Sequence, residues 1–231
     1  MTAQSECAAR IETLSARQIV NRLGRLRNTL NRKCIERSND GWNTASFDPN
    51  RLLATCKHIR LKPGMKLIAY QFRACSNGNG LVLALPAERQ IPSPVSLGDG
   101  LLPRRLPKWM DRCIAHHIEG DGSPESYFEA SILIRELSEL GAVWHGCSWS
   151  EHAVVLSDED VPAFKWEWRH ARPADWRPAF QRNASGTSIS FWTYTGYERE
   201  RVIRFEDQFT DQYDFATEAG AVAEGPGGYI H

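Results

Sequence analysis

One segment of the chain carries a full set of helix start and stop signals. Ser123 is a good N-cap, Pro124 suits the first helical position, and Gly141 is a typical stop. Between them the apolar residues recur at the spacing of one helix face: Tyr127, Phe128, Ile132, Leu133, Leu137 and Leu140. The remaining positions are left for water: Glu129, Arg135, Glu136 and Glu139. The sequence therefore predicts an amphipathic helix over about 124–140 with a single buried face.

Strand and helix patterns flank this predicted helix on both sides. Apolar and polar residues alternate over four stretches that we predict as strands: 143–149, 164–169, 187–194 and 199–205. Residues 65–75 and 81–85 are predicted to form a hairpin, because Asn77-Gly78 between them suits a tight turn. Residues 8–37 show a helical, arginine-rich pattern, and the acidic, glycine-rich tail from Asp207 is expected to be loose.

These elements together predict an α+β fold. We expect a basic helical N-terminal region, followed by a largely antiparallel sheet with the central amphipathic helix (about 124–140) packed on it.

The net charge of zero conceals an asymmetry between the two halves of the chain. Residues 1–108 hold 18 Lys and Arg against 7 Asp and Glu, whereas residues 109–231 hold 10 against 21. The stretch from Pro86 to Pro107 contains five prolines, which is typical of a linker or long loop. We therefore predict a basic region over 1–100 and an acidic α+β domain over 101–231. Three consequences of this asymmetry stay open: the halves bind different partners, the halves bind each other, or the protein self-associates.

Composition also indicates where the protein resides. No apolar run approaches the roughly 20 residues that cross a bilayer, so we expect no membrane partner. The first residues carry neither a basic start nor an apolar signal core, and the six cysteines are widely spaced, as is usual for reduced thiols. The sequence therefore predicts a cytoplasmic protein.

Residues 15–33 resemble the helix-turn-helix pattern of DNA-binding proteins. An apolar residue precedes Gly24, the expected turn, and the apolar anchor Leu30 follows six residues later. The resemblance implies that the second helix presents four residues to DNA: Arg25, Arg27, Asn28 and Arg32. Arginine suits guanine edges or phosphates, and asparagine suits adenine. The alternative is a long surface helix whose arginines are solvated.

A second candidate site lies directly before the central helix. His116 and His117 supply acid-base groups, while Glu119 and Asp121 stand two residues apart in a glycine-flanked turn. Two such carboxylates can hold Mg²⁺, which keeps several of its waters. This pattern predicts a metal-assisted hydrolase or nuclease centred on these four residues.

A zinc site is also possible in this region. Zinc prefers nitrogen and sulfur ligands, often from two close pairs, and Cys113 with His116 could pair with His145 and Cys147 across the helix. The alternative is that these are half-buried thiols and imidazoles with no metal.

Three functions therefore remain open, and the sequence names no cofactor. The first is a regulatory or nucleic-acid-binding protein, with DNA held by the basic region and a ligand or partner by the acidic domain. The second is the metal-assisted hydrolase or nuclease. The third is a non-catalytic protein that binds a protein partner or a second copy of itself.

Overall fold

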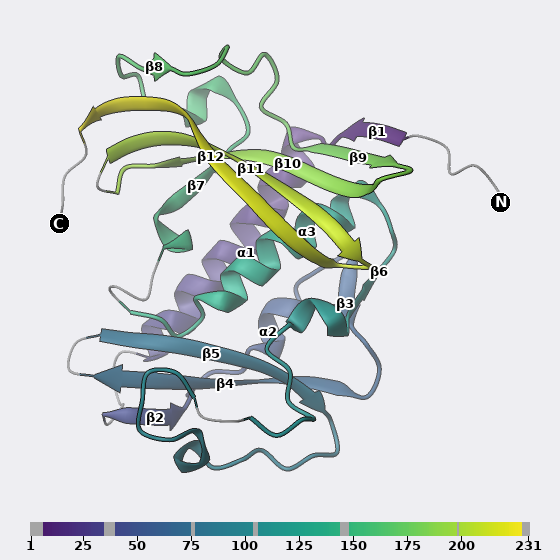
Figure 1. Cartoon of the computed structure of the whole chain (residues 1–231), viewed down its shortest axis with the longest axis vertical. Helices are drawn as coiled ribbons and strands as arrows, with labels where there is room; N and C mark the ends of the chain where they lie inside the picture. Colours follow the sequence, from purple (N-terminus) through teal and green to yellow (C-terminus); the bar gives the residue numbers. More distant parts are fainter. Residues whose placement is uncertain are drawn as a thin grey trace.

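The computed structural model describes residues 7–34, 40–74, 77–103, 106–143, 148–197 and 199–227. It is mostly sheet, with 41% of residues in strands and 26% in helices. The largest sheet is a curled antiparallel half-barrel in the order β1-β9-β10-β11-β12-β8, with β7 also paired to β10 (Figure 1). Its strands are β1 (Cys7–Arg10), β7 (His152–Val155), β8 (Glu167–Trp168), β9 (Ala179–Asn183), β10 (Gly186–Thr195), β11 (Arg199–Asp211) and β12 (Asp214–Gly227).

Two smaller sheets complete the strand content. One is β2 (Gly41–Thr44), β4 (Met65–Ala74) and β5 (Asn77–Pro86), and the other pairs β3 (Ile59–Leu61) with β6 (Ile118–Gly120). The predicted pairing of the two strands is confirmed, since β4 and β5 pair from Met65 opposite Pro86 to Ala74 opposite Asn77. The predicted turn position is wrong, because Asn77 and Gly78 lie in β5. In Figure 1 the curled sheet and the β2-β4-β5 sheet lie at opposite ends of the long axis, with the helices between them.

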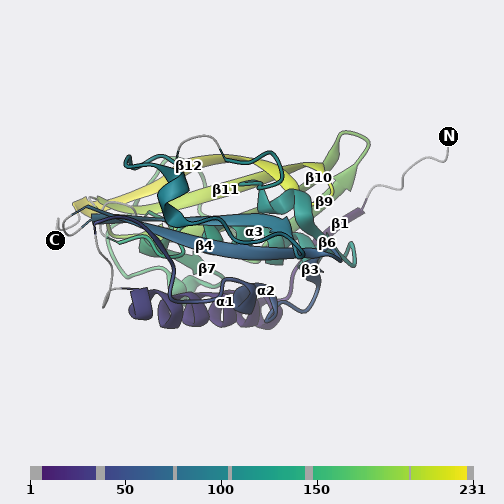
Figure 2. The ribbon, with the colours of Figure 1, turned by 90° about the horizontal axis from the view of Figure 1, so that it is seen from below.

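The α-helices are α1 (Thr13–Cys34), α2 (Asn50–Leu53) and α3 (Pro124–Ser138). Short 3₁₀ turns cover η1 (Pro94–Leu97), η2 (Ile114–His117), η4 (Trp149–Glu151) and η5 (Asp158–Asp160). Helix α3 forms over the predicted segment, and the Ser123 hydroxyl caps it by accepting the Ser126 amide at 3.2 Å. Figure 2 shows α1 along one face of the molecule, with α3 between α1 and the curled sheet.

The prediction that α3 has one buried face is wrong. The three glutamates assigned to water are in the core, with Glu129 0%, Glu136 4% and Glu139 5% exposed. Because α1 covers one side of α3 and the curled sheet covers the other, no side of most of the helix is left for solvent. The buried carboxylates accept hydrogen bonds from arginines and backbone amides instead, as buried charges must.

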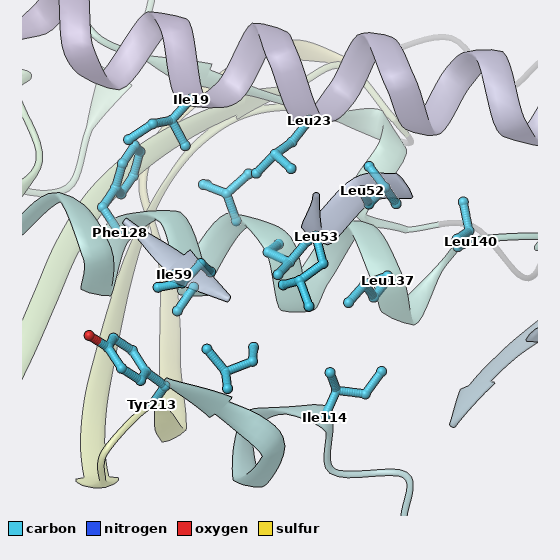
Figure 3. Close-up of a cluster of buried hydrophobic side chains, with 14 of the residues drawn as sticks. Ile19, Leu23, Leu52, Leu53, Ile59, Ile114, Phe128, Leu137, Leu140 and Tyr213 are labelled. Carbon is cyan, nitrogen blue, oxygen red and sulfur yellow. The ribbon is translucent and has the colours of Figure 1, made fainter. Parts of the chain in front are cut away.

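The predicted division into a basic helical N-terminal region and a following sheet is also wrong. Strand β1 pairs with β9 of the curled sheet, and β2 to β5 all precede residue 100. Helix α1 is flanked by strands and buries Ile19 and Leu23 in the same core cluster as Phe128 and Leu137 of α3 (Figure 3). An apolar stripe on a helix must find a partner surface, and here the partner lies across the boundary predicted near residue 100.

As far as Gly227, where the described part of the chain ends, the C-terminal tail forms a strand where we expected it to be loose. Strand β12 pairs with β11 from Asp214 to Gly227. Of the strand predicted over 164–169, only Glu167–Trp168 forms, and residues 144–147 of the strand predicted over 143–149 lie outside the described part of the chain. None of the described helices combines the length and apolar character that a membrane crossing requires.

Candidate metal centre

The site begins at Asp111, which backbone bonds attach to the β2-β4-β5 sheet. The Asp111 amide donates to the Ala84 carbonyl, and the Ala84 amide donates to the Asp111 carbonyl, both at 2.9 Å. The turn η2 follows in the chain, and Lys62 binds it through two hydrogen bonds. Lys62 Nζ donates to the His116 carbonyl at 2.7 Å, and the Lys62 amide donates to the His117 carbonyl at 2.8 Å. One end of this short segment is therefore tied to β5, and the other is tied to Lys62, the residue that follows β3.

Within the segment, one carboxylate organises two imidazoles. Asp111 Oδ2 lies 3.1 Å from His116 Nδ1 and 3.0 Å from His117 Nε2. Its other oxygen, Oδ1, accepts the Cys113 amide at 2.8 Å. Since His116 uses Nδ1 for this contact, its Nε2 is left to face the other side.

On that other side lies Asp214, the first residue of β12. Its Oδ1 is 3.5 Å from Cys113 Sγ, and its Oδ2 is 3.4 Å from His116 Nε2. Cys113, His116 and Asp214 each offer one possible ligand atom, and these atoms all lie within 4.8 Å of one another. Among the described residues, these three are the group of possible metal ligands with this spacing. We call Asp111, Cys113, His116, His117 and Asp214 the Cys113 cluster.

Tyr213 determines where Asp214 lies. Its ring is buried at 4% exposure, and its hydroxyl lies 2.9 Å from Ser126 Oγ and accepts the Gly122 amide at 3.2 Å. A Cβ at Gly120 would lie 2.2 Å from the Tyr213 hydroxyl, so this position requires glycine. The tip of the β11–β12 hairpin is thereby anchored to the start of α3, beside η2.

The charges of the cluster shift one another's protonation. The Asp111 carboxylate, by accepting a hydrogen bond from His116, raises the pKa of that imidazole above its usual value. Burial, and then the neighbouring carboxylates, raise the pKa of the Cys113 thiol. Partial burial opposes ionisation of Asp111, but bonds from the Cys113 amide and the two histidines outweigh it and lower the pKa of Asp111.

A pocket of about 330 Å³ opens beside the cluster, with Cys113 and Asp214 in its wall. The rest of the wall is mainly apolar and comes from β5, η2, α3 and β12: Leu81, Val82, Ile114, Ile134, Leu137 and Phe215. Arg112, an exposed residue, also lines it. The candidate ligands therefore meet a space that can hold a small molecule.

The structure divides the four predicted catalytic residues between two places. His116 and His117 belong to the Cys113 cluster. Glu119 instead accepts from Arg60 Nε at 2.6 Å, and Asp121 Oδ2 lies 3.0 Å from His58 Nδ1. Partial burial opposes it, but Ser123 and His58 lower the pKa of Asp121 to about 2. Glu119 and Asp121 line a separate hollow, and Asp121 also accepts the Ser123 amide at the entry to α3.

Of the predicted zinc ligands, Cys113 lies in the cluster, whereas His145 and Cys147 fall in residues 144–147, outside the described part of the chain. The sequence analysis missed two members of the cluster. Asp111 stands five residues before His116, and an aspartate so close to a His-His pair was a usable signal. Asp214 is 101 residues from Cys113, and no local pattern connects them.

The helix-turn-helix geometry predicted for residues 15–33 is not formed. Helix α1 runs through Gly24 without a turn. A Cβ at Gly24 would lie 3.7 Å from Glu136 Oε1, so this glycine faces α3 at close range instead of turning the chain. Of the four residues assigned to DNA, Arg27 donates to buried Glu136 at 2.7 Å, whereas Arg25, Asn28 and Arg32 are exposed.

The charge asymmetry between the halves is partly used inside the molecule. Five basic residues of the first half pair with acids of the second: Arg10 with Asp175, Arg17 with Asp160, Arg22 with Glu129, Arg27 with Glu136, and Arg60 with Glu119. These ion pairs use part of the basic excess of residues 1–108, including Arg27, one of the four residues assigned to DNA.

Comparison with protein-family models, with curated protein sequences and with solved structures gave no match. The functional conclusion therefore rests on the residues of the site.

Proposed function

We propose that this protein is a zinc-dependent hydrolase whose metal is held by Cys113, His116 and Asp214. The observation that carries the proposal is the arrangement of these three side chains around one point, with the second nitrogen of His116 already bound to a carboxylate.

The distances suit a tetrahedral metal ion. Zinc-ligand bonds of about 2.0–2.3 Å place neighbouring ligand atoms of a tetrahedron roughly 3.3–3.8 Å apart. Cys113 Sγ lies 3.5 Å from Asp214 Oδ1, and His116 Nε2 lies 3.4 Å from Asp214 Oδ2. With one ligand atom taken from each residue, all three atoms lie within 4.8 Å of one another, so small side-chain movements would bring them to a zinc ion. Sulfur, imidazole nitrogen and carboxylate oxygen are all accepted zinc ligands. The set favours zinc over Mg²⁺, which prefers oxygen alone.

The surroundings of His116 support the same reading. A histidine that binds a metal usually donates its other ring N–H to a carboxylate or carbonyl, which orients the ring. Asp111 occupies that position for His116. It is positioned in turn by the Cys113 amide, so one aspartate aligns a nitrogen ligand and the loop that carries the sulfur ligand.

Three protein ligands leave a fourth position open, which is the pattern of catalytic rather than structural zinc. Zinc held here would provide hydroxide near neutral pH and polarise a carbonyl group. Each turnover would consume one water and break the carbonyl C–O or C–N bond. The water oxygen joins the carbonyl carbon, one of its protons leaves with the released alcohol or amine, and the other stays with the acid or passes to solvent. The pocket beside Cys113 and Asp214 would hold the substrate.

Cobalt substitution tests the proposal. Metal-free full-length protein titrated with Co²⁺ should bind one ion and develop the near-ultraviolet absorption of a cobalt-thiolate bond. We expect Cys113→Ala to abolish that absorption and Asp214→Asn to weaken binding at least 100-fold. Cys7→Ala, at an exposed cysteine far from the cluster in the sequence, is the matched control.

Catalysis is measured on the zinc-loaded protein with a chromogenic acyl ester. Turnover that requires zinc and disappears in Asp214→Asn supports the hydrolase. If Co²⁺ binding is unchanged in both cluster variants, or if the loaded protein turns over no ester, the proposal is wrong.

Binding of DNA through α1 stays a prediction, supported now by three exposed residues on one face, Arg25, Asn28 and Arg32. The clean test is Arg25→Ala with Arg32→Ala, because Arg27→Ala would also break a buried ion pair. Duplex affinity that is steeply salt-dependent and reduced in the double variant would support it.

A further inference from the structure

We infer that the substrate is an ester or amide of a medium-chain apolar acid, whose chain fills the pocket and whose carboxyl end lies between the proposed metal and Arg112. This inference rests on the proposed function, since the bond to be broken is the one next to Cys113 and Asp214. It adds the class of substrate and a residue, Arg112, that recognises it.

The pocket wall selects an apolar group. Val82, Ile114 and Leu137 are almost fully buried, and Phe215 directly follows the proposed ligand Asp214 in β12. A sugar or a nucleotide would leave its hydroxyls or phosphates without hydrogen-bond partners against such a wall, which is unfavourable. An alkyl chain instead gains from each methylene that it buries.

The volume sets the length of the chain. At roughly 30 Å³ for a group the size of a water molecule, a pocket of about 330 Å³ holds on the order of ten non-hydrogen atoms. An eight-carbon acid has that size. Peptides of several residues or nucleic acid would fit only with most of their atoms outside the pocket.

Arg112 provides charge at this apolar site. It stands between Asp111 and Cys113 in the sequence and lines the same pocket. Across the described part of the chain, its guanidinium has no ion-pair or hydrogen-bond partner in the structure, in contrast to the arginines of α1 that face α3. A guanidinium placed here binds the carboxylate of the released acid, and it stabilises the negative charge that develops on the carbonyl oxygen during attack.

Octanoate, the acid that hydrolysis would release, is the probe. Its binding to chelator-treated full-length protein is measured by calorimetry, beside octan-1-ol, which has the same chain without the charge. We expect octanoate affinity to fall at least tenfold in Arg112→Gln, with octan-1-ol affinity unchanged. Ser138→Trp, which introduces a large ring at an exposed residue of the pocket wall, should weaken both ligands. Ser185→Trp, at an exposed turn that does not line this pocket, is the matched control.

A series of acids from butyrate to dodecanoate tests the pocket without any variant. Affinity should rise with chain length to about eight carbons and then level off. The inference is overturned if octanoate does not bind, if affinity is independent of chain length, or if Arg112→Gln weakens octanoate and octan-1-ol equally.

The two proposals fail separately. The acids are measured without metal, so loss of the zinc site would leave octanoate binding intact, and failure of octanoate to bind would leave Co²⁺ binding intact.

Discussion

Charged side chains come together in two regions, three ion pairs of the core and the Cys113 cluster. The acidic side chains of the core pairs are buried, whereas those of the cluster are partly exposed. In the core ion pairs Arg22–Glu129, Arg27–Glu136 and Arg135–Asp207, the acidic side chains are 0%, 5% and 0% exposed. In the cluster, the side chains of His116, Asp111 and Asp214 are 52%, 37% and 35% exposed.

The Arg135–Asp207 pair shows how completely a buried ion pair can be hydrogen-bonded. Asp207 accepts bonds from both terminal nitrogens of Arg135 and from the hydroxyls of Ser131 and Thr217, all at 2.7 Å. The Arg135 guanidinium also lies over four aromatic rings at 5.0–5.5 Å, those of Trp149, Phe191, Phe205 and Phe215. Saturated, buried charge of this kind orders a core. Partly exposed charges beside a pocket, as in the Cys113 cluster, are suited to bind a metal ion or another ligand.

The largest expected effect comes from breaking a core pair. Asp207→Asn leaves Arg135 buried without a counter-charge, so the free energy of unfolding should fall by about 3–5 kcal/mol. Urea denaturation in the presence of a chelator measures it. Asp111→Asn, the matched change in the cluster, should cost only about 1 kcal/mol. Equal losses in the two variants would contradict the distinction between the regions.

Added zinc should stabilise the protein through the Cys113 cluster and not through the core ion pairs. Zinc at 100 times its dissociation constant should stabilise the wild-type protein by about 2.7 kcal/mol. Asp207→Asn should keep this increment even though it lowers the baseline, whereas Asp214→Asn should lose it. Urea curves recorded with and without zinc give both values. An increment that survives in Asp214→Asn would mean that zinc binds elsewhere.

A smaller effect is expected from pH, through His152. Burial lowers the pKa of this imidazole, whose Nδ1 lies 2.8 Å from Thr193 Oγ1. The unfolded chain therefore takes up a proton first as the pH falls below about 6.5, so stability is present above that pH and is lost below it. The slope is at most about 1.4 kcal/mol per pH unit for one proton. Stability measured from pH 7 to 5 should fall less in His152→Gln than in the wild type, and an identical fall in both would show that His152 does not contribute.

The smallest effect is expected from an exposed pair. Arg60 and Glu119 lie 2.6 Å apart, but the Arg60 side chain is 79% exposed, so water screens the attraction. Arg60→Gln should change the free energy of unfolding by less than about 1 kcal/mol. A change as large as that of Asp207→Asn would show that exposure does not decide the value of an ion pair in this protein.

Elements with local signals were predictable. Helix α3 begins where Ser123 and Pro124 place it, and β4 pairs with β5 as the strand patterns predict, although Asn77 and Gly78 lie in β5 and not in the turn. Both depend on residues within a few positions of each other, and a cap or a turn acts through its own backbone.

Burial was not predictable from the same local patterns. The spacing around Glu129, Glu136 and Glu139 is that of a solvent-facing helix side, yet α1 and the curled sheet enclose them. Gly24 was expected to turn the chain, but a helix tolerates glycine when its packing compensates for a propensity loss of about 1 kcal/mol. In each case contacts between distant segments outweighed the local preference.

The sequence by itself determined the start of α3, the pairing of β4 with β5 and the grouping of Cys113, His116 and His117, because these depend on near neighbours. Only the tertiary structure decided that the arginines of α1 meet the glutamates of α3, and that Asp214 joins Cys113 from 101 residues away. Tyr213 makes that second meeting possible by anchoring the β11–β12 hairpin on α3. The physical reason is that a long-range contact depends on how whole elements bury their surfaces together, and this is not a property of any single stretch of sequence.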